Sequence, residues 1–396
     1  MAVHTMNDLR QMQALPLSIK IRMTEQRIRE WVREYGEDGV YVSFSGGKDS
    51  TVLLDIVRNR CGYTRIPAVF VDTGLEYPEI RDFVKTFDNV EWLKPELTFK
   101  EVIQKYGYPF ISKEVSEKVY YAQRYLDAIR QGADKRPSSY SVLEFLRVTD
   151  DSAKQKIKNG EISIEVLEQL FSVDSVASVK AKALFGNVIH KEKGVITDEK
   201  SKKYDFSRYK WLSLSPWKIS NQCCDVMKKR PVKKYAKKTC RVPMTGQMAE
   251  ESQLRKEHWI KNGCNGFQMK SPISNPMAFW TEQDVLRYIK ENKLQICSVY
   301  GEIVADMPDE CDGQISIEDL GLMPDNRKLK TTGCNRTGCM FCGFGCHLNN
   351  DQRFVLMKTT YPKQYEYIMK PKDQGGLGYK EIIDWINEHG NLHIQY

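Results

Sequence analysis

Apolar runs near the start of the chain predict short, buried strands. Residues 40–44 are mostly β-branched or aromatic, which is typical of a strand covered on both faces. A second run over 66–71 ends in the polar tip Asp72-Thr73-Gly74, and a third strand is expected at 90–93. Because helical stretches separate these runs, we predict an α/β fold with a doubly wound, mostly parallel sheet.

Apolar residues recur at helical spacing elsewhere. We expect an amphipathic helix over 17–35, which packs beside the sheet and ends at Gly36. From Lys113 to about residue 210 the alternation of strands and helices stops, so we predict a helical subdomain inserted into the α/β domain. Its helices are expected at 115–129, 142–147, 153–158 and 164–171, and two C-terminal helices at 362–369 and 379–388.

Composition narrows the class of protein. The 396 residues carry a net charge of +8, which favours polyanionic ligands without proving that nucleic acid is one of them. No run of about 18 apolar residues occurs and the N-terminus lacks the order of a signal peptide, so we expect a cytoplasmic protein without a membrane span. Eleven cysteines in that compartment suggest metal or redox chemistry rather than disulfides.

The first predicted strand leads into Ser45-Gly46-Gly47-Lys48-Asp49-Ser50. Two glycines allow a sharp turn whose N–H groups approach a ligand, and the helix that follows directs its positive dipole end at the same place. Lys48 adds a charge, and Ser45 and Ser50 add hydroxyls. We therefore predict a nest for a phosphate or pyrophosphate; the alternative is an ordinary strand-to-helix turn.

This hexapeptide is not the P-loop of common NTPases, because its glycines are adjacent and an aspartate follows the lysine. It resembles the loop of the PP-loop, or adenine-nucleotide α-hydrolase-like, superfamily. Enzymes of that superfamily typically cut ATP between the α- and β-phosphates. The Asp72–Gly74 tip is expected beside the loop, because ligands of parallel sheets bind at the carboxyl ends of strands.

Several motifs in sequence order resemble the phosphoadenosine phosphosulfate (PAPS) reductase family. They are the loop, the Val-Asp-Thr-Gly tip at 71–74 and the segment 107–113. The resemblance implies that Lys48, Asp49 and Asp72 are catalytic, with Mg²⁺ at the phosphates. The nucleotide, ATP or a PAPS-like molecule, would be bound by Ser45, Gly46, Gly47, Lys48, Asp49, Ser50, Asp72, Thr73, Gly74, Gly246 and Arg255.

The segment 246–255 agrees with the sequence pattern of that family at some positions and differs from it at one. Its reductases carry Gly-x-Arg-x-x-[Glu/Gln]-Ser-x-x-Arg here; Gly246, Ser252 and Arg255 match, but Met248 replaces the first arginine. That substitution removes a planar set of donors for an anionic sulfonucleotide. The last cysteine is Cys346, so the C-terminal thiolate that thioredoxin-dependent reductases use as nucleophile is also not expected.

Cys223-Cys224 and the later Cys339-x-x-Cys342 resemble the [4Fe–4S] ligand set of adenylylsulfate-type reductases and of their DNA- and tRNA-modifying relatives. Four thiolates also suit structural zinc. Cys334 and Cys346 flank the second pair, so 334–346 alone is an alternative metal site. In that alternative, Cys223 and Cys224 form a separate redox pair or are merely buried.

Eleven residues, 228–238, hold the densest basic stretch. It is either a solvated helix face or a track for the phosphates of a nucleic-acid backbone. With the family likeness, it favours an acceptor that is nucleic acid, either DNA or tRNA.

These patterns divide the chain into four parts. Residues 1–112 hold the N-terminal helix and the first half of the PP-loop domain, 113–210 the helical insertion, and 211–300 the second half of that domain. Residues 301–396 form a cysteine-rich region predicted to bind the cluster.

The leading functional hypothesis is an ATP-dependent enzyme that adenylates an acceptor and then transfers sulfur to it. The sulfur would come from a donor such as a cysteine desulfurase. One alternative is a PAPS or adenylylsulfate reductase, and another is a non-catalytic nucleotide or redox sensor.

Overall fold

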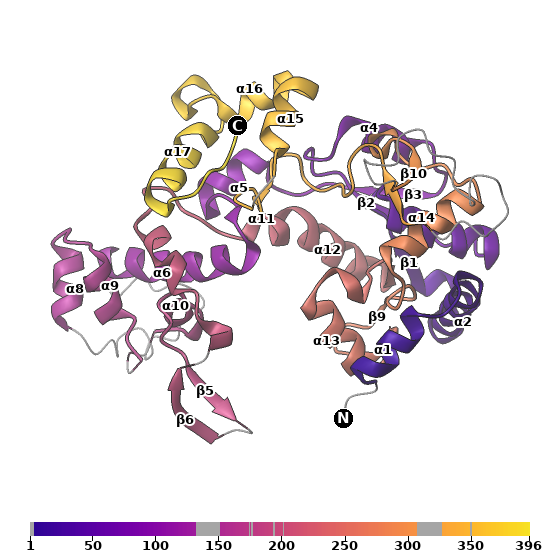
Figure 1. The fold of residues 1–396 in the computed structure, drawn as a ribbon, viewed down its shortest axis with the longest axis horizontal. Helices are drawn as coiled ribbons and strands as arrows, with labels where there is room; N and C mark the ends of the chain where they lie inside the picture. Colours follow the sequence, from indigo (N-terminus) through magenta and orange to yellow (C-terminus); the bar gives the residue numbers. More distant parts are fainter. Residues whose placement is uncertain are drawn as a thin grey trace. The chain divides into compact units, whose positions relative to one another are not determined.

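A computed structural model describes residues 4–131, 151–173, 175, 177–192, 195–200, 202–306, 327–348 and 351–396. The chain forms two compact units, each made of two stretches of sequence (Figure 1). The first contains Met1–Glu96 and Lys228–Met340, and the second contains Leu97–Met227 and Phe341–Tyr396. The four-part division of the sequence stays a prediction.

A six-stranded sheet forms the centre of the first unit, in the order β3-β2-β1-β7-β9-β8. All neighbouring strands are parallel except β8, which pairs antiparallel with β9. The α/β fold with a mostly parallel sheet is thus confirmed. Its strands are β1 (Val40–Ser43), β2 (Ala68–Val71), β3 (Val90–Leu93), β7 (Val242–Thr245), β8 (Asn265–Gly266) and β9 (Ile273–Ser274).

Strand β1 lies in the middle of this sheet because apolar side chains cover it from both sides. Val40 and Val42 are fully buried, and the strand pairs with β2 on one edge and with β7 on the other. The partner β7 is about 200 residues away in the sequence, so the second half of the unit completes the sheet that the first half begins. A separate antiparallel pair joins β10 (Ile303–Ala305) to β11 (Leu329–Thr331).

Helices pack against this sheet (Figure 1). The predicted helix at 17–35 is confirmed as α2, whose Ile28 and Trp31 are buried in the same core as β1. A buried ion pair of 2.6 Å joins Lys20 of α2 to Asp284, which also caps the start of α14. The helices of this unit are α1 (Met6–Gln13), α2 (Leu17–Tyr35), α3 (Lys48–Asp55), α4 (Pro78–Lys85), α12 (Arg230–Thr239), α13 (Gln253–Asn262) and α14 (Glu282–Glu291).

The second unit is mainly helical. Three of the predicted insertion helices are confirmed as α6, α8 and α9, whereas the one at 142–147 lies outside the described residues. The predicted C-terminal helices are confirmed as α16 and α17. The helices are α5 (Phe99–Tyr106), α6 (Lys113–Gln131), α8 (Asp151–Lys158), α9 (Ile164–Leu170), α10 (Val179–Leu184), α11 (Gln222–Cys224), α15 (Arg353–Thr360), α16 (Pro362–Met369) and α17 (Tyr379–Gly390).

The insertion also contains strands that the helical prediction did not include. An antiparallel hairpin joins β5 (Ile189–Glu192) to β6 (Val195–Lys200), and it follows α10 in the chain. Elsewhere in this unit β4 (Phe110–Ile111) pairs in parallel with β12 (Gly343–Phe344). In the described ranges, no helix combines the length and the apolar character that crossing a membrane requires.

Candidate functional site

The predicted phosphate turn lies between the end of β1 and the start of α3, as the sequence indicates. Gly46 has a φ of +71°, and a Cβ placed there would lie 2.8 Å from Val84 and 2.9 Å from Ile80 of α4. Both the backbone conformation and the lack of space therefore require glycine at this position. The turn is held between its own sheet and α4, which fixes where its N–H groups point.

Two serine hydroxyls organise the interior of the turn. The Ser45 N–H donates to Ser50 Oγ over 3.1 Å, and the two hydroxyl oxygens are also 3.1 Å apart. Ser50 Oγ donates in turn to the Gly47 carbonyl over 2.9 Å. These bonds are internal, so Ser45 and Ser50 shape the turn in this structure while the exposed Ser45 borders open space.

Lys48 is only 2% exposed and its charged end is already engaged. Its Nζ donates to the Asn335 carbonyl over 2.9 Å and lies 3.1 Å from a carboxylate oxygen of Glu282. Its backbone N–H, the first of α3, donates to the hydroxyl of Tyr300 over 3.2 Å. The three partners come from segments about 230 to 290 residues away in the sequence.

Asp49 follows Lys48 on the first turn of α3 and supplies the carboxyl group of the phosphate turn. Burial raises its pKa, and the nearby Lys48 ammonium, 3.7 Å away, partly opposes that rise. Its Oδ1 is buried and receives no hydrogen bond. A buried carboxylate oxygen without a donor has the chemistry of a cation ligand.

The strand tip at 72–74 is arranged as a rigid corner beside the turn. Asp72 is buried, and it accepts hydrogen bonds from the Gly74 N–H at 3.2 Å and from Arg81 at 2.9 Å. Thr73 donates its hydroxyl to Glu76 at 2.7 Å. Because Arg81 neutralises Asp72, this carboxylate positions the corner of β2, and a direct catalytic role would require it to leave Arg81.

Gly246 and Arg255 reach the same side of the sheet from the second stretch of the unit. A Cβ on Gly246 would lie 2.9 Å from the Asp49 carbonyl, so the two backbones are in close contact. Arg255 forms an ion pair with Glu251, which also accepts from Arg336 at 2.8 Å. Met248 is buried beside them, where the family pattern has an arginine.

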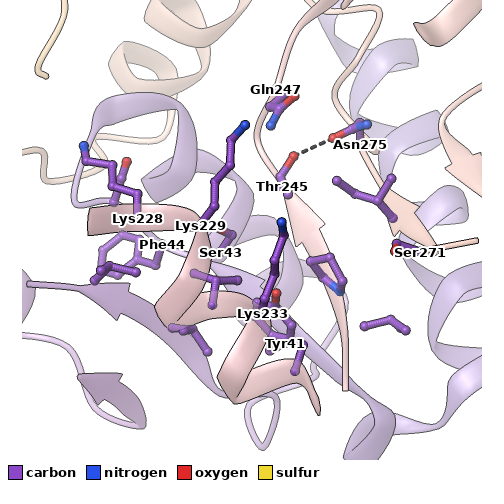
Figure 2. A pocket seen from close by; sticks show the side chains of 18 of the residues that line it. Tyr41, Ser43, Phe44, Lys228, Lys229, Lys233, Thr245, Gln247, Ser271 and Asn275 are labelled. Carbon is purple, nitrogen blue, oxygen red and sulfur yellow. Dashed lines mark hydrogen bonds between the residues drawn. The ribbon is translucent and has the colours of Figure 1, made fainter. Parts of the chain in front are cut away.

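A cavity of about 1030 Å³ opens above the ends of β1, β2 and β7, entirely within the first unit. Ser45 of the turn borders it, as do Thr245, Gln247 and Arg255. In Figure 2, Lys233 of α12 and Lys229, the residue before that helix, extend toward the cavity. Gln247 and the hydrogen-bonded pair Thr245–Asn275 border the same space. Apolar side chains, among them Trp259 and Ile273, supply another part of the wall.

The cavity wall is strongly cationic. It contains Lys228, Lys229, Lys233, Arg241 and Arg255. Its one carboxylate, Glu76, already accepts from Thr73 and lies 3.9 Å from Lys228. A cleft with such an excess of one charge concentrates anions.

The basic stretch at 228–238 is therefore divided between two environments. Lys228, Lys229 and Lys233 line the cavity, whereas Lys234 lies outside it and pairs with Glu96 at 3.0 Å. Neither of the two sequence interpretations anticipated that part of the stretch would form the wall of a pocket.

The predicted cluster ligands belong mostly to the second unit. Cys223 and Cys224 are the last two residues of the short helix α11, with their sulfurs 4.0 Å apart. Cys342 is a close neighbour: burial raises the pKa of its thiol, and the Cys224 thiol adds to that rise. Cys346 is 2% exposed, and burial raises its pKa to about 12. Cys339 falls at the end of the first unit.

The loop around Cys342 is tightly held. Arg353 donates to the carbonyls of Cys342 and Phe344 at 2.8 and 2.9 Å, and its guanidinium pairs with Asp351. Even so, no three His, Cys, Asp or Glu side chains in the described part of the chain are arranged to hold a metal ion. The four thiols have the chemistry of a four-thiolate ligand set, and the cluster predicted from the motifs stays a prediction.

Sequence reasoning missed the residues that contact the turn from the far stretch of the unit: Glu282, Tyr300, Asn335 and Thr337. No local pattern marks them, because each is an ordinary polar residue in a loop or at a helix end. Their role emerges only when the sheet brings both stretches together.

Comparison with known protein families matches residues 39–134 and 173–343 to the phosphoadenosine phosphosulfate reductase domain. A search among curated proteins found no match. The matched residues include the turn, the 72–74 corner, Gly246, Arg255 and all four predicted cluster cysteines. Since the match spans most of the chain, the protein belongs to the phosphoadenosine phosphosulfate reductase family.

Proposed function

We propose that the chain binds ATP in the cavity of the first unit and cleaves it between the α- and β-phosphates to adenylate an acceptor. One observation carries this proposal: Ser45 of the turn lines a cavity whose wall has five cationic side chains and one carboxylate. A cleft of about 1030 Å³ is large enough for a nucleotide and a reacting group of a second substrate.

The roles follow from the position of each group. The apolar wall near Trp259 and Ile273 suits the adenine ring, and the N–H groups of the turn suit the pyrophosphate. Mg²⁺ would supply charge neutralisation at the phosphates, and Asp49, with its undonated buried oxygen, fits its preference for oxygen ligands. Lys48 would balance the negative charge that develops on the leaving pyrophosphate.

The reaction has three balanced steps. An acceptor oxygen attacks the α-phosphorus, the bond from that phosphorus to the bridging oxygen breaks, and pyrophosphate leaves with the electron pair. The acceptor now carries AMP as a leaving group. A persulfide sulfur on a donor such as a cysteine desulfurase then attacks the activated carbon or phosphorus, and AMP departs. A thiol reductant cleaves the sulfur–sulfur bond that still joins donor and acceptor, so that the sulfur stays on the acceptor and the donor leaves as a disulfide with that thiol.

The cavity wall also bears on the identity of the acceptor. The cationic wall at α12 favours an acceptor that carries phosphate, such as tRNA or DNA. A [4Fe–4S] cluster at Cys223, Cys224, Cys339 and Cys342 is inferred from the motifs, and no step is assigned to it.

The family's own reduction reaction is the second candidate. It is less favoured because the buried Met248 cannot donate to a sulfonucleotide as the arginine of the family pattern would. The family match supports it in general terms. A nucleotide sensor without turnover is a third candidate, and product analysis separates all three.

The test is anaerobic purification followed by incubation with Mg²⁺ and ATP, with and without tRNA or DNA. AMP and pyrophosphate in equal amounts, dependent on an acceptor, are the expected products. Sulfite released from PAPS in the presence of a reductant would support the reductase instead. Tight ATP binding without any product, across every acceptor offered, would indicate a sensor.

A further inference from the structure

The phosphate turn of this protein is closed from the far stretch of its own unit. The Tyr300 hydroxyl accepts from the Lys48 N–H at 3.2 Å and shares a hydrogen bond of 2.7 Å with Thr337. A Cβ on Gly47 would lie 3.2 Å from the Tyr300 oxygen and 3.3 Å from the Thr337 oxygen. Two hydroxyl groups thus lie in contact with the backbone that the motif predicts for phosphate.

Those hydroxyls stand where a phosphate oxygen is expected. The Lys48 N–H is the first of α3, and the free N–H groups of a helix start are the donors that bind phosphate oxygens. Burial raises the pKa of Tyr300 to about 12, so its hydroxyl stays protonated and neutral at ordinary pH. The uncharged Tyr300 oxygen therefore accepts the hydrogen bond of the Lys48 N–H while no nucleotide is bound.

The lysine of the turn is held in the same way. Lys48 Nζ donates to the Asn335 carbonyl at 2.9 Å, and Asn335 lies two residues before Thr337. One short segment, residues 333–338, therefore lies beside Gly47 through Thr337 and accepts from the side chain of Lys48 through Asn335. We call this segment the strap. Its own start is tied to Tyr300, because the Gly333 N–H donates to the Tyr300 carbonyl at 2.9 Å.

The strap is anchored at several points, so its closure is a defined state of the fold. The Cys334 N–H donates to the Val299 carbonyl at 2.9 Å, and Arg336 donates to Glu251 at 2.8 Å. These bonds involve solvent-accessible groups and short loops, which is where local opening costs least. The strap also ends directly before Cys339.

We propose that the strap and Tyr300 form an autoinhibitory contact, in which the Tyr300 and Thr337 hydroxyls occupy a phosphate-oxygen position and must be displaced before the pyrophosphate of a nucleotide binds. This inference rests on the proposed nucleotide site. The free energy of nucleotide binding is then the gain from the hydrogen bonds between phosphate and the turn, reduced by the cost of releasing the strap.

The test compares two tyrosine variants. Tyr300→Phe removes the oxygen that caps Lys48 and leaves the ring in the core. Tyr288→Phe is the matched control, because Tyr288 is also fully buried and its hydroxyl also bonds to α3, but at Asp55, the far end of the helix. Affinity is measured by titration calorimetry with ATP and with inorganic pyrophosphate, each with Mg²⁺.

Removing the Tyr300 hydroxyl lowers the free energy needed to release the strap by about the contribution of one hydrogen bond. We therefore expect Tyr300→Phe to bind pyrophosphate about 2- to 10-fold more tightly than the natural protein, with Tyr288→Phe unchanged. Weaker binding would overturn the proposal, because it would make Tyr300 a ligand of the phosphate. Equal binding would overturn it too. Thr337→Val replaces the test if Tyr300→Phe does not fold.

Hydrogen exchange of the natural protein gives a second measurement. The amides of Gly333 and Cys334 are bonded in the closed state, and they should exchange faster once pyrophosphate is saturating. Slower exchange there would contradict displacement. The nucleotide site itself would be refuted if neither the natural protein nor Tyr300→Phe binds ATP or pyrophosphate. That outcome is distinct from a failure of the strap proposal.

Discussion

The two compact units present their candidate chemistry in opposite ways. In the first unit the residues of the phosphate turn are consecutive in sequence, and a cationic cavity borders them. In the second unit the thiols come from α11 and from the residues on either side of β12, and no group of three metal-ligating side chains is found in the described residues. A backbone nest needs only one strand, one turn and one helix, whereas a thiolate site needs distant segments in register.

The two units therefore divide the proposed function between them. Nucleotide binding requires only groups of the first unit, so it should persist when the cysteines of the second unit are changed. The predicted metal binding would require the thiols and should persist when the turn is changed. A change in one unit that alters binding in the other would contradict this independence.

The largest effect is expected from Lys48→Ala. The variant loses the amine that would balance the leaving pyrophosphate, so ATP turnover should fall about 100-fold or more. The iron and sulfide content after anaerobic purification should not change. Turnover of ATP at the natural rate would show that the turn is not the phosphate site, and joint loss of iron would show that the units are coupled.

The next largest effect is expected from Cys342→Ser in the second unit. Replacing one thiolate of a four-thiolate site should remove most of the iron found in the anaerobically purified natural protein, while ATP affinity stays the same. Cys61→Ser, in the first unit, is the control and should keep its iron. If both cysteine variants keep the natural iron content, Cys342 is not a ligand.

A smaller effect, on stability, is expected from Gly246→Ala. The added Cβ would lie 2.9 Å from the Asp49 carbonyl, so the backbone beside the turn must shift. We expect a loss of about 1–3 kcal/mol in the free energy of unfolding, together with weaker ATP binding. Gly338→Ala is the control, since a Cβ there meets nothing within 4 Å. Chemical denaturation of both variants measures the difference.

The sequence predicts much of the first unit because its signals are local. Strands β1 to β3 and helix α2 each depend on neighbouring residues, and all appear as predicted. The position of β7 beside β1 depends instead on pairing across about 200 residues. For the same reason no pattern could reveal that Tyr300 would cap Lys48.

The basic stretch shows the same limit on one helix. Its composition predicts affinity for anions, but the division between cavity-lining Lys233 and surface-paired Lys234 depends on which face α12 turns to the sheet. In the second unit, the β5–β6 hairpin was missed because its polar residues lack the apolar alternation that marks a strand.

The smallest expected effect compares one carboxyl from each unit. Burial raises the pKa of Asp49, so in the folded state its charge is unfavourable; the stability linked to its protonation is present below pH 3.8 and is lost as pH rises through the raised pKa. Asp49→Asn should therefore raise Tm by about 1–3 °C at pH 7, with no gain near pH 3.5.

Glu101 of α5 should show the opposite sign. The Thr98 backbone N–H bonds to its carboxylate and lowers its pKa, so its stabilising contribution is present at neutral pH and is lost as pH falls through the lowered pKa. Glu101→Gln should lower Tm at pH 7 and have little effect at the acid end. Melting curves of both variants between pH 3.5 and 7 measure the two trends. If Asp49→Asn instead lowers Tm at pH 7, as Glu101→Gln should, the folded protein stabilises the Asp49 carboxylate. That result would contradict the assignment of its buried oxygen as a free ligand for Mg²⁺.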